Sequence, residues 1–267
     1  MDNPIATDPL QPASPEPRPL PVGSEAPVTA YLRLSRTWTY SYLFVLPLFL
    51  FYEIGIRLAN AGSVMEVRVS ADIFVKRLLG MVGIDSTLWL SALLLALGAG
   101  IVLYERRHNI PIRPRYFAWM FGESLVYGLV IGMIVAWFVA ELFSLVWPPL
   151  LQMAGRVGTM QSIVLSLGAG VYEELVFRLL LVSAFVWLLK LAHGLKQRQR
   201  YAIAAIAGAL IFSAVHYIGS LGDTFTIPSF TFRFLMGLVL NLLFLWRGFG
   251  IAAMTHALYD VIFTLMH

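Results

Sequence analysis

The amino-acid sequence predicts an all-α membrane protein, a polytopic bundle of about seven transmembrane helices. The first observation is composition: the 267 residues are 59% hydrophobic and 13% charged, with a mean hydropathy of +0.77. A soluble domain is nearer about 45–50% apolar and about 25% charged. The second observation is that the apolar residues form long runs, each able to supply the roughly 17–25 residues of a spanning helix.

Seven apolar runs follow one another along the chain. They lie near residues 39–59, 87–104, 118–147, 161–189, 201–217, 231–246 and 250–266, and the last three are at the short end of spanning length. Between the first two runs, Val64–Gly80 mixes apolar and charged positions. This mixture predicts an interfacial amphipathic helix or, as the alternative, part of an eighth span.

The N-terminal residues differ from the rest of the chain. Residues 1–30 hold eight of the fourteen prolines and few large apolar side chains. We therefore expect residues 1–38 to be a disordered, Pro-rich cytoplasmic tail and residues 39–267 to form the transmembrane bundle. Lysine and arginine number 12 on the side of the N-terminus and 6 on the opposite side, which predicts a cytoplasmic N-terminus.

Composition also excludes several kinds of chemistry. The chain contains no cysteine, so it has no thiolate nucleophile, no disulfide and no cysteine-ligated metal. The basic residues lie in short loops between apolar runs, where they orient helices in the membrane, and we expect no nucleic-acid partner.

The most informative segment lies inside the fourth apolar run, Glu173-Glu174-Leu-Val-Phe-Arg178. A charged side chain at the centre of a membrane costs about 2.5–3.5 kcal/mol on insertion scales, so charged residues there indicate function. Glu174 and Arg178 can pair on one helix face, either structurally or within a site. Glu173 is rotated by about 100° from Glu174 and has no local partner, so it can face a cavity and act as a base.

Two later runs carry histidines. Phe212-Ser-Ala-Val-His216 places an aromatic ring and a histidine one turn apart, and His256-Ala-Leu-Tyr-Asp260 places a histidine and a carboxylate at i and i+4. Asp260 can orient the imidazole, or both can face one ligand. Taken alone, His216 fits an interfacial histidine better than a catalyst, and His256–Asp260 also fits a satisfied buried pair.

Three helices thus offer six polar side chains for one site: Glu173, Glu174, Arg178, His216, His256 and Asp260. If they converge, they could activate a water molecule and stabilise an oxyanion. As an alternative, four of them could bind a divalent metal, namely Glu173, His216, His256 and Asp260. Counted from the helix ends, His256 lies roughly 10 Å shallower than Glu173 and His216. Helix tilt, or a last helix that begins below the surface, would reconcile these depths; otherwise the span boundaries are misplaced.

The three motifs, in this order on spanning helices, resemble those of the CPBP intramembrane proteases. These comprise the type II CAAX prenyl endopeptidases and bacteriocin-processing relatives, also called the ABI family. The resemblance covers roughly residues 160–266 and implies a protease-like core there, with glutamate catalysis that needs neither metal nor cofactor. The last motif position is often asparagine in this family, and here it is Asp260, which donates a hydrogen bond only when protonated.

The resemblance also implies residue roles. Glu173 would be the general base that activates water with help from His216, and Glu174 and Arg178 would shape the site. His256 and Asp260 would stabilise the oxyanion. The enzyme would be an intramembrane CAAX-type endopeptidase acting on a membrane-associated protein or peptide.

The resemblance further suggests a partner class and a location. The partners would be membrane lipid and a substrate, with a lipidated or membrane-anchored C-terminus as one option. The short chain resembles a prokaryotic relative, so we expect a multi-pass protein of the inner (plasma) membrane.

Two alternatives from other functional classes stay open. One is a non-enzymatic immunity or scaffolding protein of the same fold, which would have no need to keep Glu173, His216 and His256 together. The other is a proton or ion transporter, because buried glutamate, histidine and aspartate also relay protons. The sequence shows no inverted repeat of the kind typical of transporters.

Overall fold

The computed structural model describes residues 26–61, 68–81, 83, 87–107, 110–144, 158–191, 194–218 and 222–266. For residues 87–90 it describes the backbone alone. The described residues form helices and connecting turns, with no strand among them. The helices are α1 (Pro27–Leu34), α2 (Trp38–Asn60), α3 (Ser70–Gly80), α4 (Thr87–Arg106), α5 (Pro114–Leu142), α6 (Thr159–Gly168), η2 (Ala169–Val182), α7 (Ser183–Leu189), α8 (Gln197–Val215), α9 (Ile227–Arg247) and α10 (Phe249–Leu265). The predicted all-α class is therefore confirmed.

Each predicted apolar run coincides with a helix or, for α6, η2 and α7, with one continuous helical stretch. Among the described helices, α2, α5 and α9 are long and apolar enough to cross a membrane, and α10 is a shorter apolar helix. Their outward faces carry large apolar side chains such as Phe51, Trp137 and Leu242. This surface suits contact with lipid; the count of seven spans stays a prediction.

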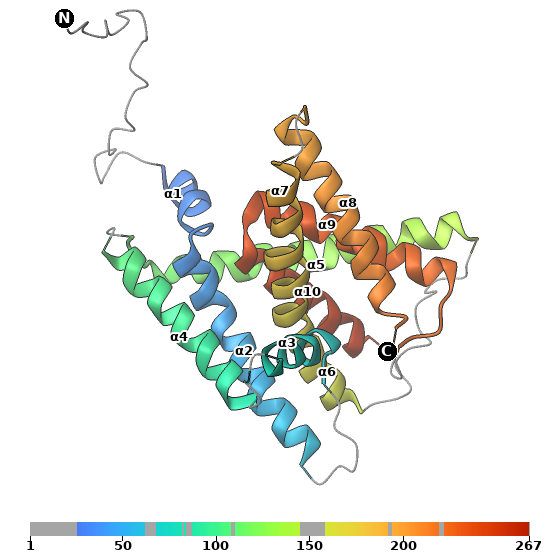
Figure 1. Cartoon of the computed structure of the whole chain (residues 1–267), viewed down its shortest axis with the longest axis horizontal. Coiled ribbons are helices and arrows are strands. Elements are labelled where there is room, and N and C mark those ends of the chain that lie inside the picture. Colours follow the sequence, from blue (N-terminus) through green and yellow to red (C-terminus); the bar gives the residue numbers. More distant parts are fainter. Residues whose placement is uncertain are drawn as a thin grey trace, which may run out of the picture.

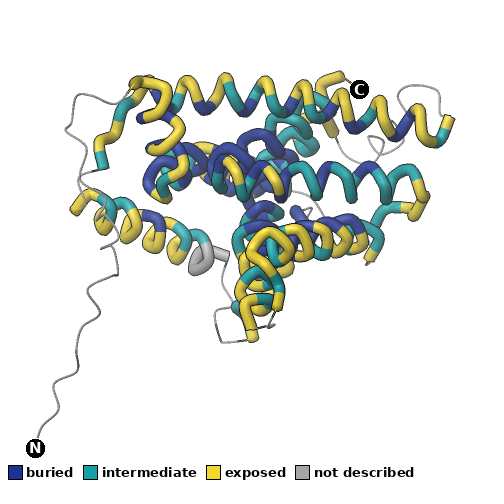
Figure 2. Tube along the Cα trace, turned by 90° about the horizontal axis from the view of Figure 1, so that it is seen from above, coloured by how far each residue is buried: buried dark blue, intermediate teal, exposed yellow. Residues whose placement is uncertain are grey.

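Helix α10 is the centre of the bundle. Every residue from Gly250 to Ala257 is buried, and α10 packs against α2, α5, α6, η2 and α9. Figure 1 shows α10 crossing behind η2, and Figure 2 shows the buried residues gathered at the middle of the molecule. Helix α9 ends at Gly248, whose φ is 89°, and α10 starts directly after it. The first turn of α10 contacts α2, where the backbone N–H of Gly250 donates to the Ser41 hydroxyl at 3.3 Å.

The separation in depth expected from the sequence is not found, because Nε2 of His256 lies 3.9 Å from Oε2 of Glu173. The first turns of α10 are buried among the neighbouring helices. The backbones of η2 and α10 also approach closely, because a Cβ on Gly170 would lie 2.6 Å from the Ala253 carbonyl oxygen. A glycine is needed at that contact.

The prediction of a disordered tail up to residue 38 is wrong for residues 27–34, which form α1; residues 1–25 lie outside the described part. Helix α1 is ordered by buried polar contacts. The Tyr31 hydroxyl donates to Glu123 of α5, and Arg247 of α9 reaches both Glu123 and the Ser35 hydroxyl, the latter at 3.0 Å. Burial, followed by the bond to Glu123, raises the pKa of Tyr31, so this phenol remains protonated.

Helix α3 forms the C-terminal part of the segment predicted to be amphipathic; residues 62–67 lie outside the described part. It crosses η2 (Figure 1) and contacts it. Its Asp72 is fully buried and accepts a hydrogen bond of 2.8 Å from the Tyr52 hydroxyl of α2. Arg68 and Lys76 pair with the same carboxylate at 3.2 and 2.5 Å. This network anchors α3 to the bundle beside the site described below.

Candidate active site

The two adjacent glutamates lie in η2, a π-helix that extends from Ala169 to Val182. Its backbone hydrogen bonds run from i to i+5, and such segments occur frequently at functional sites. This backbone differs from the α-helix that the apolar run predicts. The predicted pair nevertheless forms: Nη1 of Arg178 lies 3.1 Å from Oε1 of Glu174, and both side chains are fully buried. The guanidinium carbon also lies 4.3 Å from the centre of the Phe212 ring, a cation–π contact.

Glu174 also orients His256. The Glu174 Oε1 atom lies 2.7 Å from Nδ1 of His256, so the carboxylate accepts a hydrogen bond from Nδ1–H. The other ring nitrogen, Nε2, then faces two acidic groups: Oδ2 of Asp260 at 3.4 Å and Oε2 of Glu173 at 3.9 Å. A carboxylate that fixes the tautomer of a histidine is a common device in catalytic sites.

His216, like His256, is held through its Nδ1 atom. It caps α8, and its Nδ1 lies 2.7 Å from the carbonyl oxygen of Phe212. This leaves Nε2 directed at Glu173, again 3.9 Å from Oε2. Both histidines therefore present Nε2 to the same carboxylate oxygen. A separation of 3.9 Å is too long for a direct hydrogen bond and is one that a single bridging water molecule can span.

The structure thus brings together all six residues selected from the sequence. Glu174 and Arg178 form the buried layer and are fully enclosed. The side chains that face accessible space are Glu173, His216 and Asp260, with 13, 22 and 30% of their surfaces exposed. Within the described residues, no group of three histidine, aspartate or glutamate side chains is arranged to hold a metal ion.

Two cavities meet at Glu173 and His216, which line both. The larger has a volume of about 620 Å³ and is an open cavity lined by α3, η2, α7 and α8. Its walls are mainly apolar and include Phe74 and Leu78 of α3 and Phe177 of η2. The smaller has a volume of about 210 Å³ and is lined by Glu173, Phe212, His216, Phe232, Arg233, Met236, Leu240, His256, Tyr259, Asp260 and Phe263.

Sequence reasoning missed the residues that α3 and α9 contribute to these walls. Phe74 and Leu78 belong to no motif, and their place depends on how α3 crosses η2. Arg233 of α9 is one of the six basic residues assigned to the side opposite the N-terminus, and it lies within the sixth apolar run near its start. A charged residue inside such a run is itself a functional signal.

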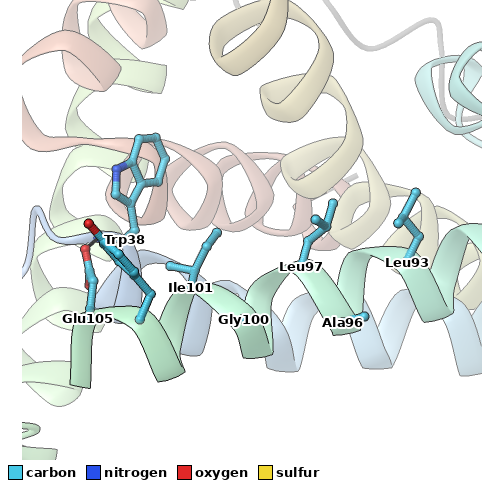
Figure 3. Close-up of a pocket in the computed structure, with 8 residues that line it drawn as sticks. Trp38, Leu93, Ala96, Leu97, Gly100, Ile101 and Glu105 are labelled. Atoms are coloured by element: carbon cyan, nitrogen blue, oxygen red, sulfur yellow. Dashed lines mark hydrogen bonds between the residues drawn. The ribbon is translucent and has the colours of Figure 1, made fainter. Parts of the chain in front are cut away.

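Another pocket lies away from these residues, along α4 beside the N-terminus of α2 (Figure 3). Its walls are apolar except at one end, where Glu105 accepts hydrogen bonds from the backbone N–H groups of Trp38 and Thr39 at 3.3 and 2.8 Å. Glu105 therefore caps α2 and ties α4 to it, as expected for a carboxylate at a helix N-terminus.

Comparison with known proteins bears on this site. Residues 154–262 match the family model described as type II CAAX prenyl endopeptidase Rce1-like. The matched segment contains all three motifs and therefore all six residues of the site. No curated protein and no solved structure matches the chain.

Proposed function

Because residues 154–262 match the model of the type II CAAX prenyl endopeptidase Rce1-like family, a family of proteases, we propose that this integral membrane protein is an intramembrane endopeptidase in which Glu173 activates the attacking water. One observation carries the proposal. Oε2 of Glu173 lies 3.9 Å from Nε2 of both His216 and His256, where two cavities meet. A carboxylate flanked by two histidines beside accessible space is suited to general-base catalysis.

The hydrolytic step follows from this arrangement. A water molecule held between Glu173 and His216 gives a proton to the carboxylate, and its oxygen attacks the carbonyl carbon of the scissile peptide. The tetrahedral oxyanion is stabilised by His256 in its imidazolium form, whose Nε2–H donates while Nδ1–H stays bonded to Glu174, and by Asp260 in its protonated form. The C–N bond then breaks, and the proton held by Glu173 passes to the departing amine, which leaves one new carboxyl group and one new amino terminus.

Glu174 and Arg178 act through His256 in this proposal. Arg178 neutralises the buried Glu174 carboxylate, and Glu174 accepts from Nδ1–H of His256. Nε2 is thereby held toward the reacting carbonyl. This division of labour gives the two adjacent glutamates different roles, one as base and one as a positioning residue.

The larger cavity suggests the substrate class. Its apolar walls, about 620 Å³ in volume, reach Glu173 and His216 and would accommodate a lipid chain or an apolar anchor next to the scissile bond. We therefore propose a membrane-associated protein or peptide with a lipidated or membrane-anchored C-terminus as substrate. The charge bias of the loops supports a cytoplasmic N-terminus. We further propose a multi-pass topology of seven or eight spans in the inner membrane of a prokaryote.

The proposal is tested by comparing wild type with Glu173→Gln in native membranes and scoring all protein termini by mass spectrometry. The substitution keeps the shape of the side chain and removes the base. We expect a set of cleavages that is present in wild type and absent in the variant, with equal protein levels. Identical termini at equal protein levels would refute the protease and favour the scaffold or transporter alternative.

A further inference from the structure

Arg233 is a charged residue of the smaller cavity with no part in the hydrolytic step. It lies in the second turn of α9, and its side chain is 13% exposed. Its Nη2 pairs with Oδ2 of Asp223 at 2.7 Å, and its Nη1 donates to the Tyr217 hydroxyl at 2.8 Å and to the hydroxyl of Ser229. These contacts hold the guanidinium at a fixed place in the cavity wall.

The smaller cavity has a mainly apolar lining with a few charged side chains. Most of its lining is apolar or aromatic, with Phe232, Met236 and Phe263 among the contributors. Among the described residues that line it, Arg233 is the one lysine or arginine, whereas Glu173 and Asp260 are acidic. An apolar pocket with a single fixed guanidinium suits a ligand that is apolar along its length and anionic at one end.

The position of the cavity indicates which part of a substrate it takes. Since Glu173 and His216 line both cavities, a scissile bond placed at Glu173 has one flank in each. The larger cavity suits the apolar anchor. The smaller has about a third of that volume, so it has room for only a short segment on the other flank, and a short segment that ends there carries a terminal carboxylate.

We propose that the smaller cavity binds the short C-terminal segment that is released by cleavage, and that Arg233 binds its α-carboxylate. This inference rests on the proposed endopeptidase function and adds a rule of substrate selection to it. A guanidinium presents several N–H donors in a planar fork that matches a carboxylate. Asp223, whose side chain is 33% exposed, can share the guanidinium with the incoming carboxylate or be replaced by it.

Arg233 is also connected to the catalytic residue His216 through Asp223. Its role in binding substrate must therefore be distinguished from a role in positioning His216. The backbone N–H of Asp223 donates to the carbonyl oxygen of His216 at 2.9 Å. The Arg233–Asp223 ion pair therefore steadies the segment that follows His216. If Arg233 served only as a positioning residue for His216, its loss would slow the cleavage of every substrate by the same factor.

The test uses the full-length protein in lipid nanodiscs and two fluorogenic peptides. Both carry an S-prenylated cysteine followed by three residues, and they differ only in ending as a free carboxylate or as a carboxamide. We expect wild type to cleave the acid with a kcat/KM at least about tenfold above that of the amide, since hydrogen bonds between charged groups are strong. Arg233→Gln should bring the acid-to-amide ratio to about one, and Arg233→Lys should give an intermediate ratio.

Asp223→Asn is the matched control, because it removes the ion pair and keeps the guanidinium. We expect it to retain the preference for the acid. An equal rate on both peptides in wild type would overturn the carboxylate site without a variant having to fold. A ratio unchanged by Arg233→Gln would overturn it as well and leave Arg233 as a positioning residue. If wild type cleaves neither peptide and shows no Glu173-dependent cleavage in membranes, the proposed function itself fails and the inference falls with it.

Discussion

Nδ1 of His256 lies 2.7 Å from Oε1 of Glu174, although the two residues are 82 positions apart in the chain. The same oxygen lies 3.1 Å from Nη1 of Arg178. One fully buried carboxylate therefore joins the cation of its own helix to the imidazole of α10. The close contact between η2 and α10 at Gly170 makes this possible. Stability and orientation of the site are thus coupled at Glu174.

Arg178→Ala should destabilise the protein. The substitution leaves the fully buried Glu174 carboxylate without its cation, and breaking a buried ion pair in this way costs about 3–5 kcal/mol. We expect a clear fall in the midpoint of thermal unfolding in detergent, together with a lower yield. Arg57→Ala is the comparison variant: Arg57 pairs with Glu53 at 3.4 Å, also at i and i+4, and is 45% exposed. Glu53 is buried as well, but it keeps a hydrogen bond of 2.7 Å from the Tyr172 hydroxyl when Arg57 is removed.

The Arg57→Ala variant should be less destabilised than Arg178→Ala, because the guanidinium that it removes is half-exposed and Glu53 retains the Tyr172 hydrogen bond. Equal unfolding midpoints for both variants would contradict a stabilising role of the Glu174–Arg178 pair.

Asp260→Asn should remain active. Glu174 already fixes the imidazole of His256 through Nδ1, so Asp260 is left to act beside Nε2, at 3.4 Å. An asparagine amide can donate a hydrogen bond there, as a protonated aspartate would. We expect kcat/KM within about tenfold of wild type, and a loss of roughly 100-fold or more in Asp260→Leu, which removes the donor. If Asn proves as damaging as Leu, the charge of Asp260 is what the site requires.

The contacts within one helix could be predicted from the sequence, and those between helices could not. Glu174–Arg178 and His256–Asp260 follow from spacing at i and i+4, and both pairs form. The contact between Glu174 and His256 depends instead on a glycine in η2 meeting the backbone of α10. No periodicity encodes that approach, nor the π-helical backbone that carries the glutamates.

The N-terminal boundary and the cavity walls escaped prediction for a related reason. Composition marked residues 1–38 as a tail, but Tyr31 is held by Glu123, which is 92 positions away. Phe74 of α3 and Arg233 of α9 enter the cavities through tertiary packing. The sequence around Phe74 predicts only an amphipathic helix, and the sequence around Arg233 predicts only the edge of a membrane span, so neither indicates a cavity wall.

Removal of metal ions should leave the activity unchanged. Among the described residues, no three histidine, aspartate or glutamate side chains are grouped to hold a metal, and the proposed mechanism assigns the activation of water to Glu173. We expect the purified protein to contain substoichiometric zinc by elemental analysis and to keep its kcat after treatment with 1,10-phenanthroline. Stoichiometric zinc, with activity lost to the chelator and restored by zinc alone, would support the alternative set of Glu173, His216, His256 and Asp260 as ligands.

Leu78→Trp should narrow the choice of substrate. Leu78 lines the larger cavity from α3, and because it is 48% exposed its replacement should cost little stability. The indole takes up space that an apolar chain would occupy. Each CH₂ group excluded from the cavity forfeits about 0.8 kcal/mol of burial, so KM should rise about fourfold per excluded group for long-chain substrates and stay near wild type for short ones.

Leu58→Trp provides the control for added aromatic surface. Leu58 is 71% exposed on α2 and does not belong to the lining of the larger cavity, so this variant should treat long and short chains as wild type does. Phe74→Ala changes the cavity in the opposite direction, because it removes a wall side chain from the same helix, and it should extend the range toward longer or bulkier chains. KM measured across a series of chain lengths separates these outcomes. If Leu78→Trp raises KM equally for every chain length, the apolar part of the substrate does not lie between α3 and η2.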